Sequence, residues 1–265
     1  MPLKSANLLP HSPLLIPEIA QMNYAFFKKT NEAYAETAEK LITKDVETII
    51  IISSHAEISK DSFCLNVAPE MIINLKEFGF IPPKTIIKSD AIFADQINSK
   101  LGQDFPIEMI SESVLDHGSA IPIFLLKNLG LNKKIIVISP ASELDANKHY
   151  DFGLALGKLI NESEKNIAII ASGDLSHRLK RKSPGGYSPK GAKFDNKIIE
   201  NLSTDNKAAE NLLKMEEKLI NEAGECAYKS LIISLGILNE KSFESKIMAY
   251  QNDFGVGYLS VDFKF

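Results

Sequence analysis

Hydrophobic positions along the chain follow two spacings, one typical of buried strands and one typical of amphipathic helices. Three continuous runs are rich in β-branched residues: Val46–Ser53, Lys134–Ser139 and Asn166–Ser172. Such runs favour strands that are covered on both faces, as in a parallel sheet. The stretch Asn23–Lys44 instead repeats its aromatic and aliphatic residues at intervals of seven, four and three, which predicts an amphipathic helix.

Shorter segments continue this alternation to the end of the chain. Strands are predicted at Phe63–Val67, Ile107–Ile110 and Phe254–Phe263, and helices at Ala91–Leu101, Ser119–Leu129, Asn206–Glu222 and Cys226–Leu235. Ser119 is the expected N-cap of its helix, and Pro122 is expected in the first turn, where its missing N–H costs nothing. The alternation predicts an α/β fold, a single domain over residues 1–265 whose largely parallel or mixed central sheet carries helices on both faces.

Composition adds that the chain has no global charge bias. Hydrophobic residues make up 45% and charged residues 24% of the sequence, and the formal net charge is -4. This balance does not favour nucleic acid or an anionic membrane as a partner, and no apolar run reaches the roughly 18 residues of a membrane span.

Two cysteines, Cys64 and Cys226, are too few for a disulfide scaffold, and the N-terminal residues lack the apolar stretch of a signal peptide. We therefore expect a cytoplasmic protein with free thiols.

Three of the five histidines follow predicted strands. His55 and His177 come after two of the β-branched runs, and His11 lies in a proline-flanked turn after a short apolar segment. Ligands of open α/β sheets bind beyond the carboxyl ends of the strands, so these imidazoles are expected to converge and to form a metal site. His117 precedes a predicted helix, whose N-terminus suits an anionic substrate group. His149 lies among polar residues and is expected on an exposed turn.

Two neutral imidazoles require an anionic third ligand, and a site with two histidines and one carboxylate leaves coordination positions open for oxygen and substrate. Glu225 is the first candidate, because the preceding Gly224 allows close approach of the backbone at the start of a predicted helix,. Glu222 and Cys226 remain alternatives. A cysteine thiolate would shift the preference toward zinc or copper(I).

Six short segments, in this order, carry a resemblance to a known family. They are Leu9-Pro-His-Ser-Pro-Leu-Leu15, Ser53-Ser-His-Ala56, Leu115-Asp-His-Gly-Ser119, Ser172-Gly-Asp-Leu-Ser-His177, Ala223-Gly-Glu-Cys-Ala-Tyr-Lys-Ser230 and Phe254-Gly-Val-Gly-Tyr258. The chain resembles the class III extradiol ring-cleavage dioxygenases, typified by the catalytic subunit of protocatechuate 4,5-dioxygenase and including Memo-like relatives. The resemblance extends over almost the whole chain.

The resemblance implies a mononuclear non-haem iron(II) held by His11, His55 and Glu225. It also implies that His177 is the acid/base residue and that His117 lines the substrate site. The implied substrates are a small catechol or aminophenol and O2. A histidine with a pKa near neutrality can take up and return a proton, and Asp174 either orients His177 or caps the local turn.

The same residues are compatible with two other functions. A zinc-dependent hydrolase could use His11, His55 and Glu225 around a metal-bound water, since Zn(II) accepts such ligand sets. A Memo-like metal-binding or redox protein would instead use Cys226 as a ligand and cleave no ring. The sequence is also compatible with a homo-oligomer, because homodimers are the commonest assembly.

The segment Arg178–Lys193 combines prolines, glycines and basic residues without periodicity, which predicts a long loop of the kind that often covers a site. Because it directly follows His177, we expect it near the mouth of the pocket. Its lysines and arginines would attract an anionic substrate such as an aromatic carboxylate. Gly185 and Gly186 would let it move, and Tyr187 would offer an aromatic face. The alternative is a solvated basic turn without contact to the site.

Overall fold

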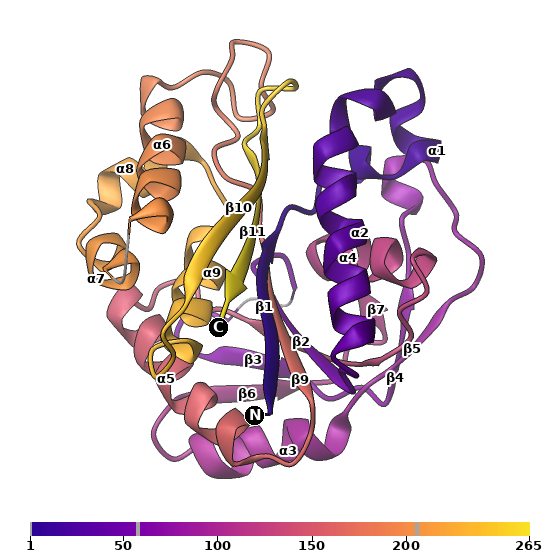
Figure 1. The fold of residues 1–265 in the computed structure, drawn as a ribbon, viewed down its shortest axis with the longest axis vertical. Coiled ribbons are helices and arrows are strands. Elements are labelled where there is room, and N and C mark those ends of the chain that lie inside the picture. The colour runs from indigo at the N-terminus through magenta and orange to yellow at the C-terminus, as the bar shows by residue number, and fades with distance from the viewer. Residues whose placement is uncertain (1, 57–58, 205–206) are drawn as a thin grey trace.

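The computed structural model describes residues 2–56, 59–204 and 207–265. Its main sheet contains β1 (Leu3–Leu9), β2 (Thr48–Ser53), β3 (Phe63–Asn66), β6 (Ile107–Ile110), β8 (Lys134–Ser139), β9 (Ile167–Ser172), β10 (Glu244–Gln251) and β11 (Tyr258–Lys264). The strand order is β10-β11-β1-β9-β2-β8-β3-β6. A smaller sheet of β4 (Glu70–Ile73), β5 (Ile86–Lys88) and β7 (Val114–Leu115) lies beside it (Figure 1).

The centre of the main sheet is parallel, and its flanks are mixed. β1 and β2 both pair in parallel with β9, and β2 pairs in parallel with β8. β11 runs antiparallel to β1, and β3 runs antiparallel to β8. In the register of the central strands Ser172 lies opposite both Leu9 and Ser53. The segments that follow these three strands therefore leave the sheet at the same edge, as the histidine pattern predicted.

Helices cover both faces of the sheet, which confirms the predicted α/β architecture (Figure 1). The α-helices are α1 (Pro17–Ala20), α2 (Lys28–Thr43), α3 (Ala91–Leu101), α4 (His117–Asn128), α5 (Ala146–Glu162), α6 (Pro189–Ser203), α7 (Ala208–Leu213), α8 (Glu217–Ala223) and α9 (Tyr228–Ile237). Alternate side chains of β2 enter different cores: Ile50 and Ile52 pack with α5 and α9, whereas Ile49 and Ile51 pack with α2 and α4. This two-sided burial is the physical reason for the continuous isoleucine run.

Several predicted boundaries are corrected by the structure. The helix expected over Asn23–Lys44 begins as the 3-10 helix η2 (Gln21–Phe27) and becomes α-helical only in α2. The helix expected over Asn206–Glu222 is divided into α7 and α8, and Asn206 itself lies outside the described residues. α8 ends at Gly224, which has a φ of 61°, a left-handed conformation that glycine adopts without strain. Among the described residues, no helix is long and apolar enough to cross a membrane.

Helix α4 begins earlier than its sequence pattern predicted. Asp116, rather than Ser119, is the N-cap, and its carboxylate accepts a hydrogen bond from the Ser119 N–H at 3.0 Å. Pro122 consequently lies inside the helix rather than in its first turn. A proline has no N–H for the carbonyl four residues earlier, so the carbonyl of Gly118 is left available for another donor.

The position of His149 also differs from the prediction, which expected it on an exposed turn. It lies within α5 and is completely buried rather than exposed on a turn. Its Nδ1 is 2.7 Å from the carbonyl oxygen of Asp145, and its Nε2 is 3.0 Å from that of Ala141. The polar neighbours of His149 in the sequence face solvent, whereas its imidazole lies within hydrogen-bonding distance of two backbone carbonyl groups.

A buried carboxyl group holds the segment that carries His177. Asp195 of α6 accepts hydrogen bonds from the Ser176 N–H at 2.9 Å and from the Tyr250 hydroxyl at 2.7 Å. Asp195 is fully buried, and burial raises the pKa of its carboxyl from 3.8 to about 6. The folded state therefore keeps this proton at pH values where the unfolded chain has lost it, and this contribution to stability is lost as the pH rises from about 4 to above 6.

Replacing Asp195 with Asn is expected to remove this pH dependence. The amide preserves the shape, accepts from the Ser176 N–H through its oxygen and donates to the Tyr250 hydroxyl oxygen through its NH2 group,. Because it never ionises, the variant should exceed the parent in free energy of unfolding by up to about 3 kcal/mol above pH 6. Urea unfolding between pH 4 and pH 8 measures the difference, with Asp151→Asn on the exposed side of α5 as the control. A difference that does not grow between pH 4 and pH 6 would contradict the assignment.

Candidate metal centre

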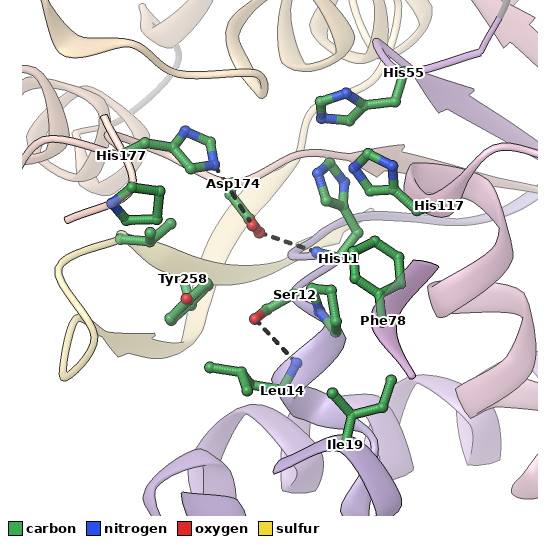
Figure 2. A pocket seen from close by; sticks show the side chains of 13 residues that line it. His11, Ser12, Leu14, Ile19, His55, Phe78, His117, Asp174, His177 and Tyr258 are labelled. Carbon is green, nitrogen blue, oxygen red and sulfur yellow. Dashed lines mark hydrogen bonds and ion pairs between the residues drawn. The ribbon is translucent and has the colours of Figure 1, made fainter. Parts of the chain in front are cut away.

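A cavity of about 390 Å³ opens at the sheet edge where β1, β2 and β9 end. Its lining residues are His11, Ser12, Pro13, Leu14, Ile19, His55, Phe78, His117, Asp174, His177, Pro184, Val256 and Tyr258. Figure 2 shows the imidazoles of His11, His55 and His117 grouped on one side and that of His177 across from them, beside Asp174. The structure thus brings together the four histidines that the sequence analysis singled out.

The side chain of His11 is held with one nitrogen ready to bind a metal. Its Nδ1 lies 2.9 Å from the Ser172 hydroxyl, and that hydroxyl donates its own proton to the carbonyl of Gly118, which Pro122 leaves free. Because a hydroxyl has a single proton, His11 must donate to Ser172 through Nδ1–H. Nε2 of the neutral ring then carries the lone pair, an arrangement common among metal-binding histidines.

Cys226 provides the nearest sulfur to that lone pair. Its Sγ lies 3.4 Å from His11 Nε2 and accepts a hydrogen bond from the backbone N–H of Asp174 at 3.3 Å. Gly173 makes this approach possible, because a Cβ there would come within 2.3 Å of the Cα of Ala227. Burial and the nearby Asp174 carboxyl raise the pKa of the Cys226 thiol well above 9. The thiol therefore keeps its proton in the metal-free chain, and a metal ion bound by Cys226 would displace that proton.

His55 and His117 complete this side of the cavity. Their ring centroids are 4.2 Å apart, and that of His55 is 4.8 Å from that of His11. The Asp116 carboxylate links the two segments by accepting a hydrogen bond from the Ser53 hydroxyl at 2.6 Å while it caps α4. Burial, followed by the charge of His117, lowers the pKa of His55 to about 4, and burial lowers that of His11 well below 6.5. Both rings are therefore neutral near pH 7, the form that binds metals.

Among the described residues, the group suited to hold a metal is His11, His55 and Cys226, whose ligand atoms all lie within 4.8 Å of one another. Two neutral imidazoles and one ionisable thiol form a ligand set that fits a divalent ion. Glu225 is not part of this group: its carboxylate accepts a hydrogen bond from the Tyr228 N–H at 2.6 Å and lines a neighbouring cavity of about 290 Å³. Glu222 lies on α8, and its backbone carbonyl accepts a hydrogen bond from Arg178. The metal role of Glu225 stays a prediction.

His177 is oriented as a base that faces the cavity. Its Nδ1 is 2.6 Å from the carbonyl oxygen of Gly224, which can only accept, so Nδ1 carries the proton,. Nε2 is then unprotonated in the neutral ring and lies 4.0 Å from a carboxylate oxygen of Asp174 (Figure 2). Burial lowers the pKa of His177 and raises that of Asp174 to about 7. Asp174 also accepts a hydrogen bond from the backbone N–H of His11 at 3.0 Å, so its carboxyl group lies between the two histidines.

The segment predicted as a loop over Arg178–Lys193 reaches the cavity only in part. Pro184 lines the cavity, whereas none of the basic residues of this segment does. α6 begins at Pro189, so the irregular part is shorter than predicted. Arg178 and Lys180 donate to the backbone carbonyls of Glu222 and Asp253, and Tyr187 is exposed. The basic residues of this segment, which were expected to attract an anionic substrate, therefore do not line the cavity.

Sequence reasoning missed three residues that shape the site. Phe78 lies edge-on to His117, with ring centroids 5.7 Å apart. It belongs to the short 3-10 helix Lys76–Phe78 between β4 and β5, which no periodicity in the sequence predicted. Tyr258 lines the cavity from the start of β11. Ser172 fixes the His11 ring from inside β9. Ser172 and Tyr258 had a sequence signal, because Ser172 begins and Tyr258 ends one of the six resemblance segments, whereas Phe78 had none.

Comparison with known proteins identifies the class. The model of the family described as the catalytic LigB subunit of aromatic ring-opening dioxygenase matches residues 5–260, and the chain belongs to this family. The resemblance found in the motifs is thus confirmed.

Two individual proteins show how far the likeness extends. Protein CA_C1420 of Clostridium acetobutylicum is 31% identical over 268 residues, which cover 97% of this chain and 57% of that protein. The chain therefore spans little more than half the length of this relative. The crystal structure of the uncharacterized protein JW3007 from Escherichia coli K12 has a TM-score of 0.69 and 18% identity, covering 98% of this chain and 99% of the other. It shows that the fold is shared.

Proposed function

We propose that the chain is a metal-dependent dioxygenase that opens the ring of a small aromatic diol or aminophenol, with iron(II) as the metal. The observation that carries this proposal is the position of the His11, His55 and Cys226 group beside an apolar cavity that also contains His177. A cavity of about 390 Å³ falls in the range of small-molecule sites. Membership in the ring-opening family supports the same chemistry.

In this proposal the metal is held by His11 Nε2, a ring nitrogen of His55 and the Cys226 thiolate. Cys226 replaces Glu225, the third ligand implied by the resemblance, because its sulfur is beside His11 while the Glu225 carboxylate caps the start of α9. When bound, the metal supplies a Lewis acid for the adjacent substrate oxygens and a template for both substrates.

The chain's own side chains would position the substrate and move its proton. Phe78 and His117 offer ring faces and edges against which an aromatic ring can pack,. His177 Nε2, which is unprotonated and faces the cavity, would accept a proton from a substrate hydroxyl and later return it. Leu14, Ile19 and Val256 line the cavity and would shield a bound ring from water.

Anaerobic reconstitution with iron(II) tests the proposal. After removal of unbound metal, the protein is mixed with O2 and with catechol, 4-methylcatechol or 2-aminophenol. We expect consumption of one O2 for each ring opened, detected with an oxygen electrode and by the absorbance of the ring-opened product. Oxygen uptake equal to that of the metal-free protein with every substrate would contradict the proposal.

The thiol of Cys226 favours a second candidate function. Cys226 gives the group a soft ligand, and soft ligands favour zinc or copper(I) over iron(II),. The chain would then be a Memo-like metal-binding or redox protein without ring cleavage. Competition between iron(II), zinc(II) and copper(I) for the apoprotein separates the two candidates. Selective retention of copper(I), together with absence of oxygen uptake on the aromatic panel, would favour the second.

A further inference from the structure

We infer that the cavity selects aromatic substrates whose ring substituents carry no negative charge. This inference rests on the proposed function and specifies its substrate class. It replaces the sequence-based expectation of an aromatic carboxylate, which depended on the basic residues between Arg178 and Lys193.

The wall of the cavity provides no cationic partner for a carboxylate. Six of the lining residues are apolar: Pro13, Leu14, Ile19, Phe78, Pro184 and Val256. Among the described residues that line the cavity, none is a lysine or an arginine, and the five positions outside the description contain neither residue type in the sequence. A carboxylate moved from water into such surroundings without a partner loses solvation that nothing in the wall replaces.

The polar groups of the cavity do not compensate for this loss. The hydroxyl of Ser12 accepts a hydrogen bond from the Leu14 N–H at 3.3 Å (Figure 2), and a neutral hydroxyl that donates to a carboxylate offsets only part of the solvation that the charge loses. Asp174 is acidic and supplies acceptor oxygens rather than a cation,. The charge of a divalent metal would be offset by the Cys226 thiolate and by the ionised diol itself.

The basic residues of the neighbouring loop bind backbone carbonyls or face solvent, and none of them lines the cavity. Arg178 donates to the Glu222 carbonyl at 3.4 Å, and the Lys180 ammonium donates to the Asp253 carbonyl at 2.9 Å. Arg181 and Lys182 are exposed to solvent, where salt screens their charges within about 8 Å at physiological ionic strength. A neutral ring substituent, by contrast, would be buried against the aliphatic wall and stabilised by contact with it.

Equilibrium binding without turnover tests the inference. The zinc(II)-loaded protein, which cannot carry out the redox reaction, is titrated anaerobically with 4-methylcatechol and with 3,4-dihydroxybenzoate in a calorimeter. These probes differ only in a methyl group and a carboxylate at one ring position. We expect the dissociation constant of the carboxylate to be at least about tenfold higher. Equal or tighter binding of 3,4-dihydroxybenzoate would overturn the inference and leave the proposed ring-opening function standing.

Matched variants locate the origin of the preference. Leu14→Arg places a cation in the cavity wall and is expected to reverse the preference toward 3,4-dihydroxybenzoate, whereas Leu14→Met should preserve it. The double variant Arg181→Glu, Lys182→Glu should leave the ratio of the two dissociation constants unchanged, and a fall in affinity for the carboxylate alone would overturn the inference. If the parent binds neither catechol, both the inference and the proposed function are wrong.

Discussion

Replacement of Cys226 with Ala is expected to lower the affinity for iron(II) or zinc(II) by more than about a hundredfold. Loss of a group that merely hydrogen-bonds to a metal ligand already costs about 10- to 100-fold, and Cys226 Sγ is itself one of the three ligand atoms that lie within 4.8 Å of one another. Metal content after dialysis, measured by mass spectrometry, gives the effect. Cys226→Ser retains an acceptor for the Asp174 N–H and should lose metal similarly with an intact fold.

Two matched variants make this result decisive. Glu225→Gln keeps an oxygen that can accept from the Tyr228 N–H and should retain metal. Cys64→Ala removes the other thiol, which is buried in β3, and should retain metal as well. If Glu225→Gln loses the metal and Cys226→Ala keeps it, the ligand set is His11, His55 and Glu225, as the resemblance implied.

Replacement of His177 with Ala is expected to leave metal content unchanged and to lower turnover on a catechol by about a hundredfold or more, the usual scale for a proton-transfer residue. The reason is geometric: His177 Nε2 faces the cavity across from the ligand group and is not among its members. Steady-state oxygen uptake of the iron-loaded variant gives the effect, with the exposed Arg181→Ala as a control for the loop. Loss of the metal in the variant would make His177 a ligand instead.

The sequence predicted the parts of the site that depend on strand ends. β-branched runs are local signals for buried strands, and parallel strands end at one edge, so the pattern predicted that His11 and His55 lie together,. The third ligand was harder, because Glu225 and Cys226 are neighbours in the chain. Which of them faces His11 depends on the approach of Gly173 to Ala227 across the fold, and no local pattern reports that contact.

Elements with weak patterns were missed for related reasons. β10 pairs only with β11 at the edge of the sheet, and most of its side chains are only partly buried, so its sequence lacks the continuous apolar run of the central strands. Helix α6 was not predicted: its first residues were assigned to a loop, because Pro189, Lys190 and Gly191 interrupt helical periodicity, and the rest of it was assigned to no element. There, proline occupies N1 with Ser188 as the cap, where proline is favoured.

Pro122 lowers the stability of helix α4, but it also leaves the Gly118 carbonyl available to Ser172, which orients His11. An alanine there would be a better helix former by about 3 kcal/mol, and its N–H would pair with the Gly118 carbonyl. That N–H would compete with the Ser172 hydroxyl for the Gly118 carbonyl. A Ser172 hydroxyl that turned away from the carbonyl would donate to His11 Nδ1 and move the ring proton to Nε2, the atom that faces Cys226. In that arrangement a substitution chosen to make this protein more heat-resistant would convert a metal-binding lone pair into a proton donor. Directed evolution for thermal tolerance and selection for metal occupancy would therefore act in opposite directions at residue 122.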